Sequence, residues 1–217
     1  RVVVTGLGCI TSLGHNPEEY WQALQAGKSG AANIQAFDTT NFDVHFACEV
    51  KNFTPEAYFP VPQAKRMDRF AQFAVAAAIQ SVKDSSIDFT KTNLTRVGVI
   101  IGSGVGGFTE FEEQHSRLIL KGPSRVSPFT IPKVMMNSAP GQVAIHFGLK
   151  GPNFCVVPDE CDRQSLSGFY PAELIPNFLG NNNLTFGMHL HNSHRNCLVC
   201  GLAEVDSSPP TGELQLR

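Results

Sequence analysis

Short apolar runs without polar alternation recur through residues 1–157, and segments with helix signals lie between them. Residues 1–5 form one such run, residues 96–101 a second and residues 154–157 a third. A strand that is apolar on both faces is typical of a parallel sheet covered by helices. Strands that alternate with helices therefore predict an α/β domain with a mainly parallel sheet.

The first strand and the first helix have recognisable boundaries. The two glycines within residues 6–8 are expected to turn the chain after the strand. Asn16 and Pro17 form a typical helix start, because Asn caps a helix and Pro suits its first position. Trp21 and Leu24 are expected to form the apolar face of this helix.

The strongest helical pattern runs from residue 66 to about residue 83. Apolar residues recur there at helical spacing, namely Met67, Phe70, Phe73, Ala74, Ala77, Ala78 and Val82. A further helix is predicted from Asn137 or Ser138 to Gly148, where glycine ends it.

The composition changes at Pro158. Residues 1–157 hold eight lysines, with 14 basic and 12 acidic residues in all, whereas residues 158–217 hold no lysine, with 3 basic and 7 acidic residues. Prolines and the run Asn181-Asn182-Asn183 interrupt the second segment. We therefore divide the chain into a folded domain, residues 1–157, and a divergent tail, residues 158–217, that is expected to be poorly structured.

Bulk composition narrows the classes of partner. With 17 basic and 19 acidic residues the charge does not suggest nucleic-acid binding, and no apolar stretch approaches the roughly 20 residues that span a bilayer. Six cysteines are too few for a disulfide scaffold. A reducing compartment is therefore expected, either the cytoplasm or the matrix of a plastid or mitochondrion.

Residues 102–107 match the G-x-G-x-x-G pattern and follow a predicted strand, which would suit a dinucleotide. Such a site needs an acidic strand end about 20 residues later, and residues 122–128 are neither acidic nor strand-like. A structural glycine turn is the better interpretation, and a nucleotide-binding domain stays an alternative.

A cluster in the tail has spacings compatible with zinc ligation, formed by His189, His191, His194, Cys197 and Cys200. A zinc finger separates its two ligand pairs by a longer loop, so a chance cluster is favoured. Neither a metal nor another cofactor is predicted.

Three cations stand at the start of the strongest helix: Lys65, Arg66 and Arg69. Positive charge is unfavourable at a helix N-terminus, so the cluster suggests an anionic partner. Taken alone, an ordinary solvated helix end is the better interpretation.

Several stretches together resemble the β-ketoacyl-[acyl carrier protein] synthases that elongate fatty acids, the type II enzymes in particular. They occur in family order and comprise residues 1–8, 11–14, 65–70, 101–107, 127–129 and 148–152. The resemblance covers residues 1–157.

The resemblance implies an incomplete thiolase-like fold, of which residues 1–157 form the N-terminal half, with helices on both faces of the sheet. The family enzymes are homodimers that condense acyl and malonyl thioesters with loss of CO₂. Their nucleophile is a cysteine at the N-terminus of a buried helix, assisted by two histidines of the C-terminal half. In a lone half, the apolar run of residues 71–78 is expected to stay exposed.

The chain departs from the family where the nucleophile should stand. That position falls on Glu160, and Cys161 lies one residue later. Asp159 and Glu160 would raise the pKa of a thiol by repulsion, so Cys161 is a weak candidate and no catalytic residue is predicted. Cys155 is expected to pack as a small apolar residue. The chain is therefore expected to be an inactive fragment, with a non-catalytic carrier-binding module as the rival interpretation.

Binding roles carry over from the resemblance at matching positions. The residues expected to face the acidic acyl carrier protein are Lys65, Arg66 and Arg69. The residues expected to line the acyl pocket are Gly104, Val105 and Gly106. Phe129 is expected to lie near the dimer interface.

Overall fold

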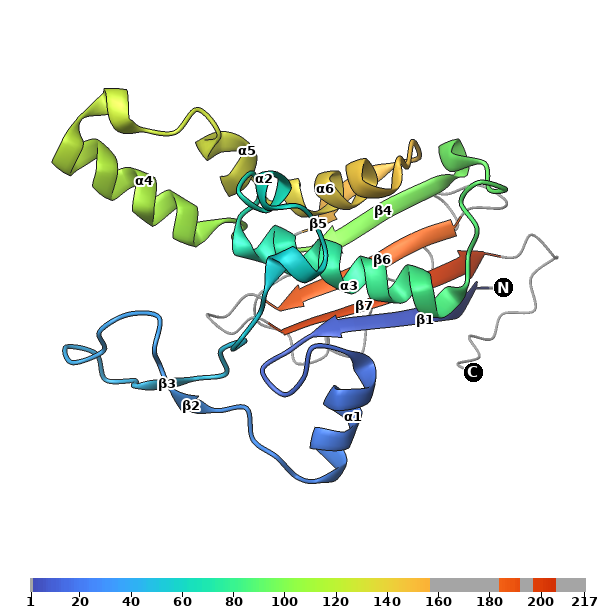
Figure 1. The fold of residues 1–217 in the computed structure, drawn as a ribbon, viewed down its shortest axis with the longest axis horizontal. Coiled ribbons are helices and arrows are strands. Elements are labelled where there is room, and N and C mark those ends of the chain that lie inside the picture. Colours follow the sequence, from blue (N-terminus) through green and yellow to red (C-terminus); the bar gives the residue numbers. More distant parts are fainter. Residues whose placement is uncertain (1, 157–183, 192–196, 206–217) are drawn as a thin grey trace.

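The computed structural model describes residues 2–156, 184–191 and 197–205, and its main sheet has five strands in the order β1-β7-β6-β4-β5 (Figure 1). These strands are β1 (Val2–Ile10), β4 (Val97–Gly102), β5 (Asn153–Val156), β6 (Leu184–His191) and β7 (Cys197–Val205). Strand β4 is parallel to β5 and β6, whereas β7 is antiparallel to β1 and β6. Four strands therefore share one direction, and the pairings of β4 with β5 and β6 are parallel as predicted, whereas the two pairings of β7 are antiparallel.

Helices and a small hairpin surround this sheet. The helices are α1 (Pro17–Gln25), α2 (Val61–Ala64), α3 (Arg69–Ser85), α4 (Phe108–Lys121), α5 (Thr130–Val134) and α6 (Ser138–Phe147). Short 3-10 turns lie at Pro55–Ala57, Leu94–Arg96 and Pro123–Arg125, and β2 (Ala32–Asn33) pairs with β3 (Phe46–Ala47).

Helices α3 and α6 lie on the same face of the main sheet, whereas α4 and α5 form an arm that projects from the body (Figure 1). The family's buried nucleophile helix would follow β5, where residues 157–183 lie outside the described residues. Helices were predicted on both faces of the sheet, and the described helices do not include one that covers the face opposite α3 and α6.

The long helix α3 forms the centre of the core. Apart from Gln72, residues 71–78 are at most 1% exposed, so the expectation that this run stays exposed in a lone half is wrong. The sheet covers one side of the helix, and α6 and the loop around Phe53 cover the rest, with the Phe53 and Phe73 rings 4.8 Å apart. This chain therefore supplies its own cover for α3.

The glycines after the first apolar run extend the strand and do not turn the chain. Strand β1 continues to Ile10, with a register shift between Val4 and Gly6. A Cβ atom on Gly8 would lie 2.1 Å from the Ala77 carbonyl oxygen of α3. Glycine is needed there because it lets the α3 backbone approach the strand.

Side chains of α3 cover the outer edge of β1. The Leu7 amide donates to Asp84 Oδ2 at 2.8 Å, and the Cys9 amide donates to Gln80 Oε1 at 3.1 Å. An uncovered strand edge is a site for unwanted strand pairing, so these bonds protect the sheet.

The predicted start of α1 at Asn16 and the predicted end of α6 at Gly148 are confirmed, whereas α3 begins at Arg69 and not at residue 66. The Asn16 side chain accepts from the Glu19 amide at 2.9 Å. Trp21 and Leu24 are 60% and 44% exposed, so the apolar face that they were expected to form is not the buried face of α1. The buried residue of α1 is Ala23, so the helix packs against the body through this small side chain.

The tail, residues 158–217, contributes two strands to the main sheet, β6 and β7. They lie in the middle of the sheet between β1 and β4. Apolar residues alternate with polar residues or glycine from Leu184 to His191, which is the pattern of a strand and was the missed signal. The domain boundary at residue 157 stays a prediction.

The zinc alternative falls on residues 189–200, whose side chains lie outside those that the structure describes. In the part of the chain that is described, no group of three or more His, Cys, Asp or Glu residues is placed to hold a metal ion. No helix within the same ranges is long and apolar enough to cross a membrane.

Candidate functional site

The basic turn, residues 65–69, joins α2 to α3. Helix α2 ends at Ala64, helix α3 begins at Arg69, and Lys65 and Arg66 are exposed between them. Asp68 is the N-cap of α3 and is 9% exposed. Its carboxylate offsets the unfavourable positive charge at this helix N-terminus.

Asp68 caps two helices with one carboxylate. Its Oδ1 accepts from the Phe70 amide of α3 at 3.3 Å, and its Oδ2 accepts from the Glu110 amide of α4 at 3.1 Å. The N-cap residue of α4 is Gly107, which has no side chain for this purpose. Burial raises the pKa of Asp68 against the opposing effect of these two amide donors.

Glu110 continues the connection into α5. Its Oε2 accepts from Lys133 Nζ at 2.8 Å, and the side chains of Glu110 and Lys133 are 7% and 17% exposed. The other carboxylate oxygen, Oε1, is buried without a hydrogen-bond partner among the described residues. The ion pair therefore fastens the start of α4 to α5.

The structure brings two of the predicted site residues into contact. The Arg66 guanidinium lies 5.9 Å from the centroid of the Phe129 ring, and Phe129 directly precedes α5. A cation over an aromatic face gains about 0.5–1 kcal/mol at an exposed site. The predicted roles of Arg66 in carrier binding and of Phe129 in dimer formation stay predictions, but the two residues are not independent.

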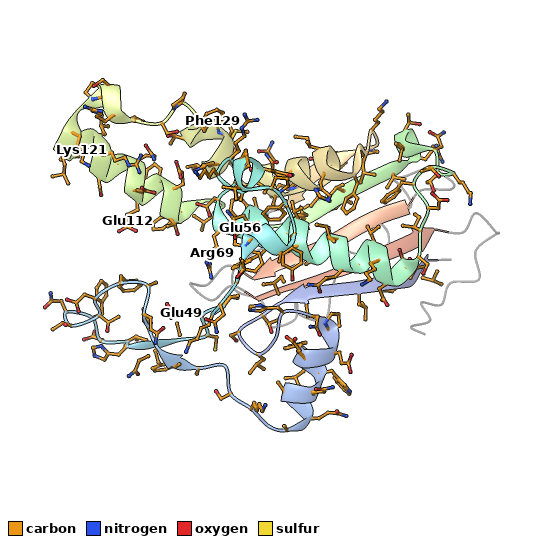
Figure 2. The ribbon with its side chains drawn as sticks, viewed as in Figure 1. Glu49, Glu56, Arg69, Glu112, Lys121 and Phe129 are labelled. Carbon is orange, nitrogen blue, oxygen red and sulfur yellow. The ribbon has the colours of Figure 1, made fainter. Side chains whose placement is uncertain are left out.

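Arg69 differs from the other two cations of the turn. Its Nη2 donates to the Val50 carbonyl at 2.7 Å, and its guanidinium lies 5.0 Å from the Phe73 ring centroid. Partial burial of its guanidinium lowers the pKa of Arg69, while Glu49 and Asp68 act in the opposite direction. Figure 2 labels Arg69 and Glu49. Arg69 therefore holds the loop at Val50 against α3, and its role in carrier binding stays a prediction.

The glycine loop between β4 and α4 lies against the backbone of residues 133–134. Gly106 has φ +80°, and a Cβ atom there would lie 2.4 Å from the Val134 carbonyl oxygen. A Cβ atom on Gly107 would lie 2.4 Å from the Lys133 carbonyl oxygen. These two glycines thus permit a close backbone approach, which favours the structural interpretation of the motif.

The geometry of this loop does not suit binding of a nucleotide phosphate. Phosphate sites use free amides at a helix N-terminus, and here the Glu110 amide already donates to the Asp68 carboxylate. The buried negative charge of Asp68 and the carbonyl groups at 133 and 134 would repel a phosphate. The nucleotide alternative therefore has no support from this geometry.

The remaining residues predicted for the acyl pocket lie in the same loop. Gly104 is half-buried, and Val105 is 47% exposed. The assignment of Gly104, Val105 and Gly106 to an acyl pocket stays a prediction.

The arm carries a second basic cluster that the sequence analysis missed. Arg117, Lys121 and Arg125 line a hollow of about 570 Å³. Lys121 lies at the far end of α4 from Arg69 (Figure 2), and Arg117 also forms an exposed ion pair with Glu113. The spacing of four residues between Arg117 and Lys121 was the available signal for these two cations, once a helix is assigned to residues 108–121.

Among the described cysteines, Cys155 stands nearest in sequence to the expected nucleophile. It lies half-buried in β5, where burial raises the pKa of its thiol and the Ser103 backbone amide lowers it. A raised pKa makes a thiol less reactive, as suits a packing residue. Cys161 lies outside the described residues.

Residues 1–159 match the family model described as the β-ketoacyl synthase N-terminal domain. The chain belongs to the β-ketoacyl synthase family. The 3-oxoacyl-[acyl-carrier-protein] synthase 2 of Vibrio cholerae serotype O1 is 46% identical over 156 residues, which are 72% of this chain and 38% of that protein. The protein of the same name from Synechocystis sp. is 45% identical over 157 residues, with the same two shares. The chain thus spans 38% of the length of these relatives.

Solved ketosynthases share the fold. The ishigamide ketosynthase/chain length factor has a TM-score of 0.75 at 23% identity. The match covers 94% of this chain and 58% of the ketosynthase chain. A β-ketoacyl synthase from Burkholderia phymatum has a TM-score of 0.71 at 21% identity, covering 94% and 59%. These likenesses confirm the thiolase-like fold. They also extend past residue 159, where the family match ends, in keeping with a main sheet that includes β6 and β7.

Proposed function

We propose that this chain serves a β-ketoacyl-[acyl carrier protein] synthase of fatty-acid elongation, in which acyl and malonyl thioesters condense with loss of CO₂, and that it supplies a docking surface for the acyl carrier protein. One observation carries the proposal: Lys65 and Arg66 are exposed on a turn that buried Asp68 caps and Phe129 contacts. The names of the relatives support the reaction. One solved neighbour, with a TM-score of 0.71, is a ketosynthase in complex with its acyl-carrier protein, which supports the partner.

The geometry suits an acidic partner for a physical reason. Cations that are already ordered lose less conformational entropy on binding than cations on a mobile loop. Exposed positive charge also speeds the encounter with an acidic protein. Arg66 meets both conditions, because its guanidinium lies over the Phe129 ring and the residue is exposed. Lys65 meets the second condition, and Arg69, although exposed, is partly engaged by the Val50 carbonyl.

Condensation itself is not expected of these 217 residues. Asp159 and Glu160 directly precede Cys161 and oppose formation of its thiolate. The proposed role is thus binding and not chemistry. We place Phe129, which is 48% exposed, near an interface between two copies. A reducing compartment suits the free thiols of the described cysteines, Cys9, Cys48 and Cys155.

The test is the affinity of the chain for a fluorescently labelled bacterial acyl carrier protein, measured by anisotropy at low ionic strength. Reversing both exposed charges (Lys65→Glu with Arg66→Glu) should weaken binding roughly tenfold, since each exposed charge pair contributes about 0.2–1 kcal/mol. The matched control is Lys28→Glu, an exposed lysine next to α1. Equal affinities for the double variant and the unchanged chain would contradict the proposal.

A further inference from the structure

We propose that Asp68 is a positioning residue that fixes the arm, residues 108–134, relative to the basic turn and thereby orients Arg66. As regards the carrier protein, this inference rests on the proposed function. The claim about the arm stands on the geometry alone.

The first step is the shared cap. The Asp68 carboxylate accepts from an amide in the first turn of α3 and from an amide in the first turn of α4, which lie 40 residues apart along the chain (Phe70 and Glu110). Because Gly107 offers α4 no side-chain cap, the start of α4 depends on Asp68 for this acceptor. The carboxylate is 9% exposed, so water cannot readily replace it.

The second step carries the position of α4 to Phe129. The start of α4 is fastened to α5 by the Glu110–Lys133 ion pair and by the Gly107 amide, which donates to the Val134 carbonyl at 3.1 Å. Phe129 precedes α5 immediately. A change in the angle of α4 would therefore move Phe129 as well.

The third step returns to the turn. The Arg66 guanidinium lies over the Phe129 ring, and Arg66 is two residues from Asp68 in sequence. The contacts thus form a closed path that runs from Asp68 through α4 and α5 to Phe129 and back to Arg66. Figure 1 shows that the arm projects away from the sheet. The described contacts of Asp68, of Glu110 with Lys133 and of Arg66 with Phe129 lie where the arm joins the body.

The proposal is tested on the full chain with two variants of Asp68. Asp68→Ala removes both acceptor oxygens. Asp68→Asn keeps one acceptor oxygen and is the milder variant if the alanine variant does not fold. The matched control is Asp84→Ala, which also removes a carboxylate that accepts from a backbone amide, that of Leu7, but at the other end of α3.

The first readout is geometry and does not involve the carrier protein. Spin labels introduced as noncanonical residues at Glu56 in the body and Leu120 on the arm, both exposed, report their separation by pulsed electron paramagnetic resonance (Figure 2 labels Glu56). The distance distribution should broaden in Asp68→Ala and stay narrow in Asp84→Ala. Hydrogen exchange at the Glu110 amide should be about fivefold faster in Asp68→Ala, the loss expected for a helix cap. A narrow distribution with a protected Glu110 amide in that variant overturns the proposal.

The second readout is affinity for the labelled acyl carrier protein. Asp68→Ala should bind about fivefold more weakly and Asp84→Ala as tightly as the unchanged chain, because only the first releases Arg66. If the distance distribution broadens in Asp68→Ala but the affinity is unchanged, the link between Asp68 and carrier-protein binding is overturned. If the unchanged chain does not bind the carrier protein, the proposed function fails, and the distance distribution alone decides whether Asp68 positions the arm.

Discussion

The carboxylate of Glu110 and the ammonium of Lys133 form an ion pair inside the arm, with Oε2 and Nζ 2.8 Å apart. Both side chains are largely buried, so each charge depends on the other for compensation. Lys133→Met should therefore lower the free energy of unfolding by about 3 kcal/mol, because it leaves a buried carboxylate without a partner. Urea denaturation followed by circular dichroism measures this change.

The control for this ion pair removes both charges together. Replacing a buried pair by apolar residues of similar size is often neutral, so Glu110→Leu in the Lys133→Met background should restore most of the lost stability. A double variant that is as unstable as the sum of the two single variants would show that the pair is not coupled.

Two glycines should respond to alanine in opposite ways. A Cβ atom on Gly8 would lie 2.1 Å from the Ala77 carbonyl oxygen, so Gly8→Ala should lower the free energy of unfolding by about 3 kcal/mol through overpacking. Gly141 lies within α6, and a Cβ atom there meets nothing within 4 Å. Gly141→Ala should raise the free energy of unfolding by about 0.5–1 kcal/mol, the helix propensity difference. A neutral Gly8→Ala would contradict the close approach of α3 to β1.

Local sequence signals were sufficient to predict the helices whose ends are capped. The Asn16 cap, the apolar spacing of α3 and the left-handed Gly148, with φ +69°, place three helices correctly. The same logic failed for Gly6 and Gly8, because the reason for those glycines is the α3 backbone, about 70 residues away in sequence. A tertiary contact of that kind leaves no local pattern.

The candidate site shows the same division. The cations of the basic turn were identified as a cluster, and the family resemblance gave them a partner. That Asp68 would cap α4, or that Arg66 would lie over Phe129, could not be predicted, because each contact joins residues that are distant in sequence. The strands of the tail are a different case, since the alternation from Leu184 to His191 was present in the sequence.

Stability should depend on pH through His146. This half-buried ring packs edge-on against Phe147, and burial lowers the pKa of His146 below its ordinary value of 6.5. Between the lowered pKa and 6.5 the unfolded chain binds the proton more readily than the folded chain. The contribution of His146 is therefore fully present above 6.5 and is lost as the pH falls through the lowered pKa.

The measurement is the urea midpoint at several values of pH between about 5 and 7.5, the range in which histidine titrates. His146→Gln should flatten the profile, because glutamine has no proton to bind in this range. His45→Gln changes an exposed histidine near β3 and serves as the control. Profiles that are identical for the unchanged chain and His146→Gln would show that burial of this ring has no effect on its protonation.

The last prediction concerns catalysis by the chain itself. A condensing nucleophile must be a thiolate, and the carboxylates of Asp159 and Glu160 next to Cys161 disfavour that charge. Cys155, which lies within β5 and was expected to be a packing residue, has a pKa raised by burial. We therefore expect no ketoacyl product when the purified chain is mixed with acyl- and malonyl-carrier protein, as followed by mass spectrometry of the carrier-bound thioesters. Product that disappears in Cys161→Ala but persists in Cys155→Ala would make Cys161 a working nucleophile, and the chain would then be an enzyme and not only a docking surface.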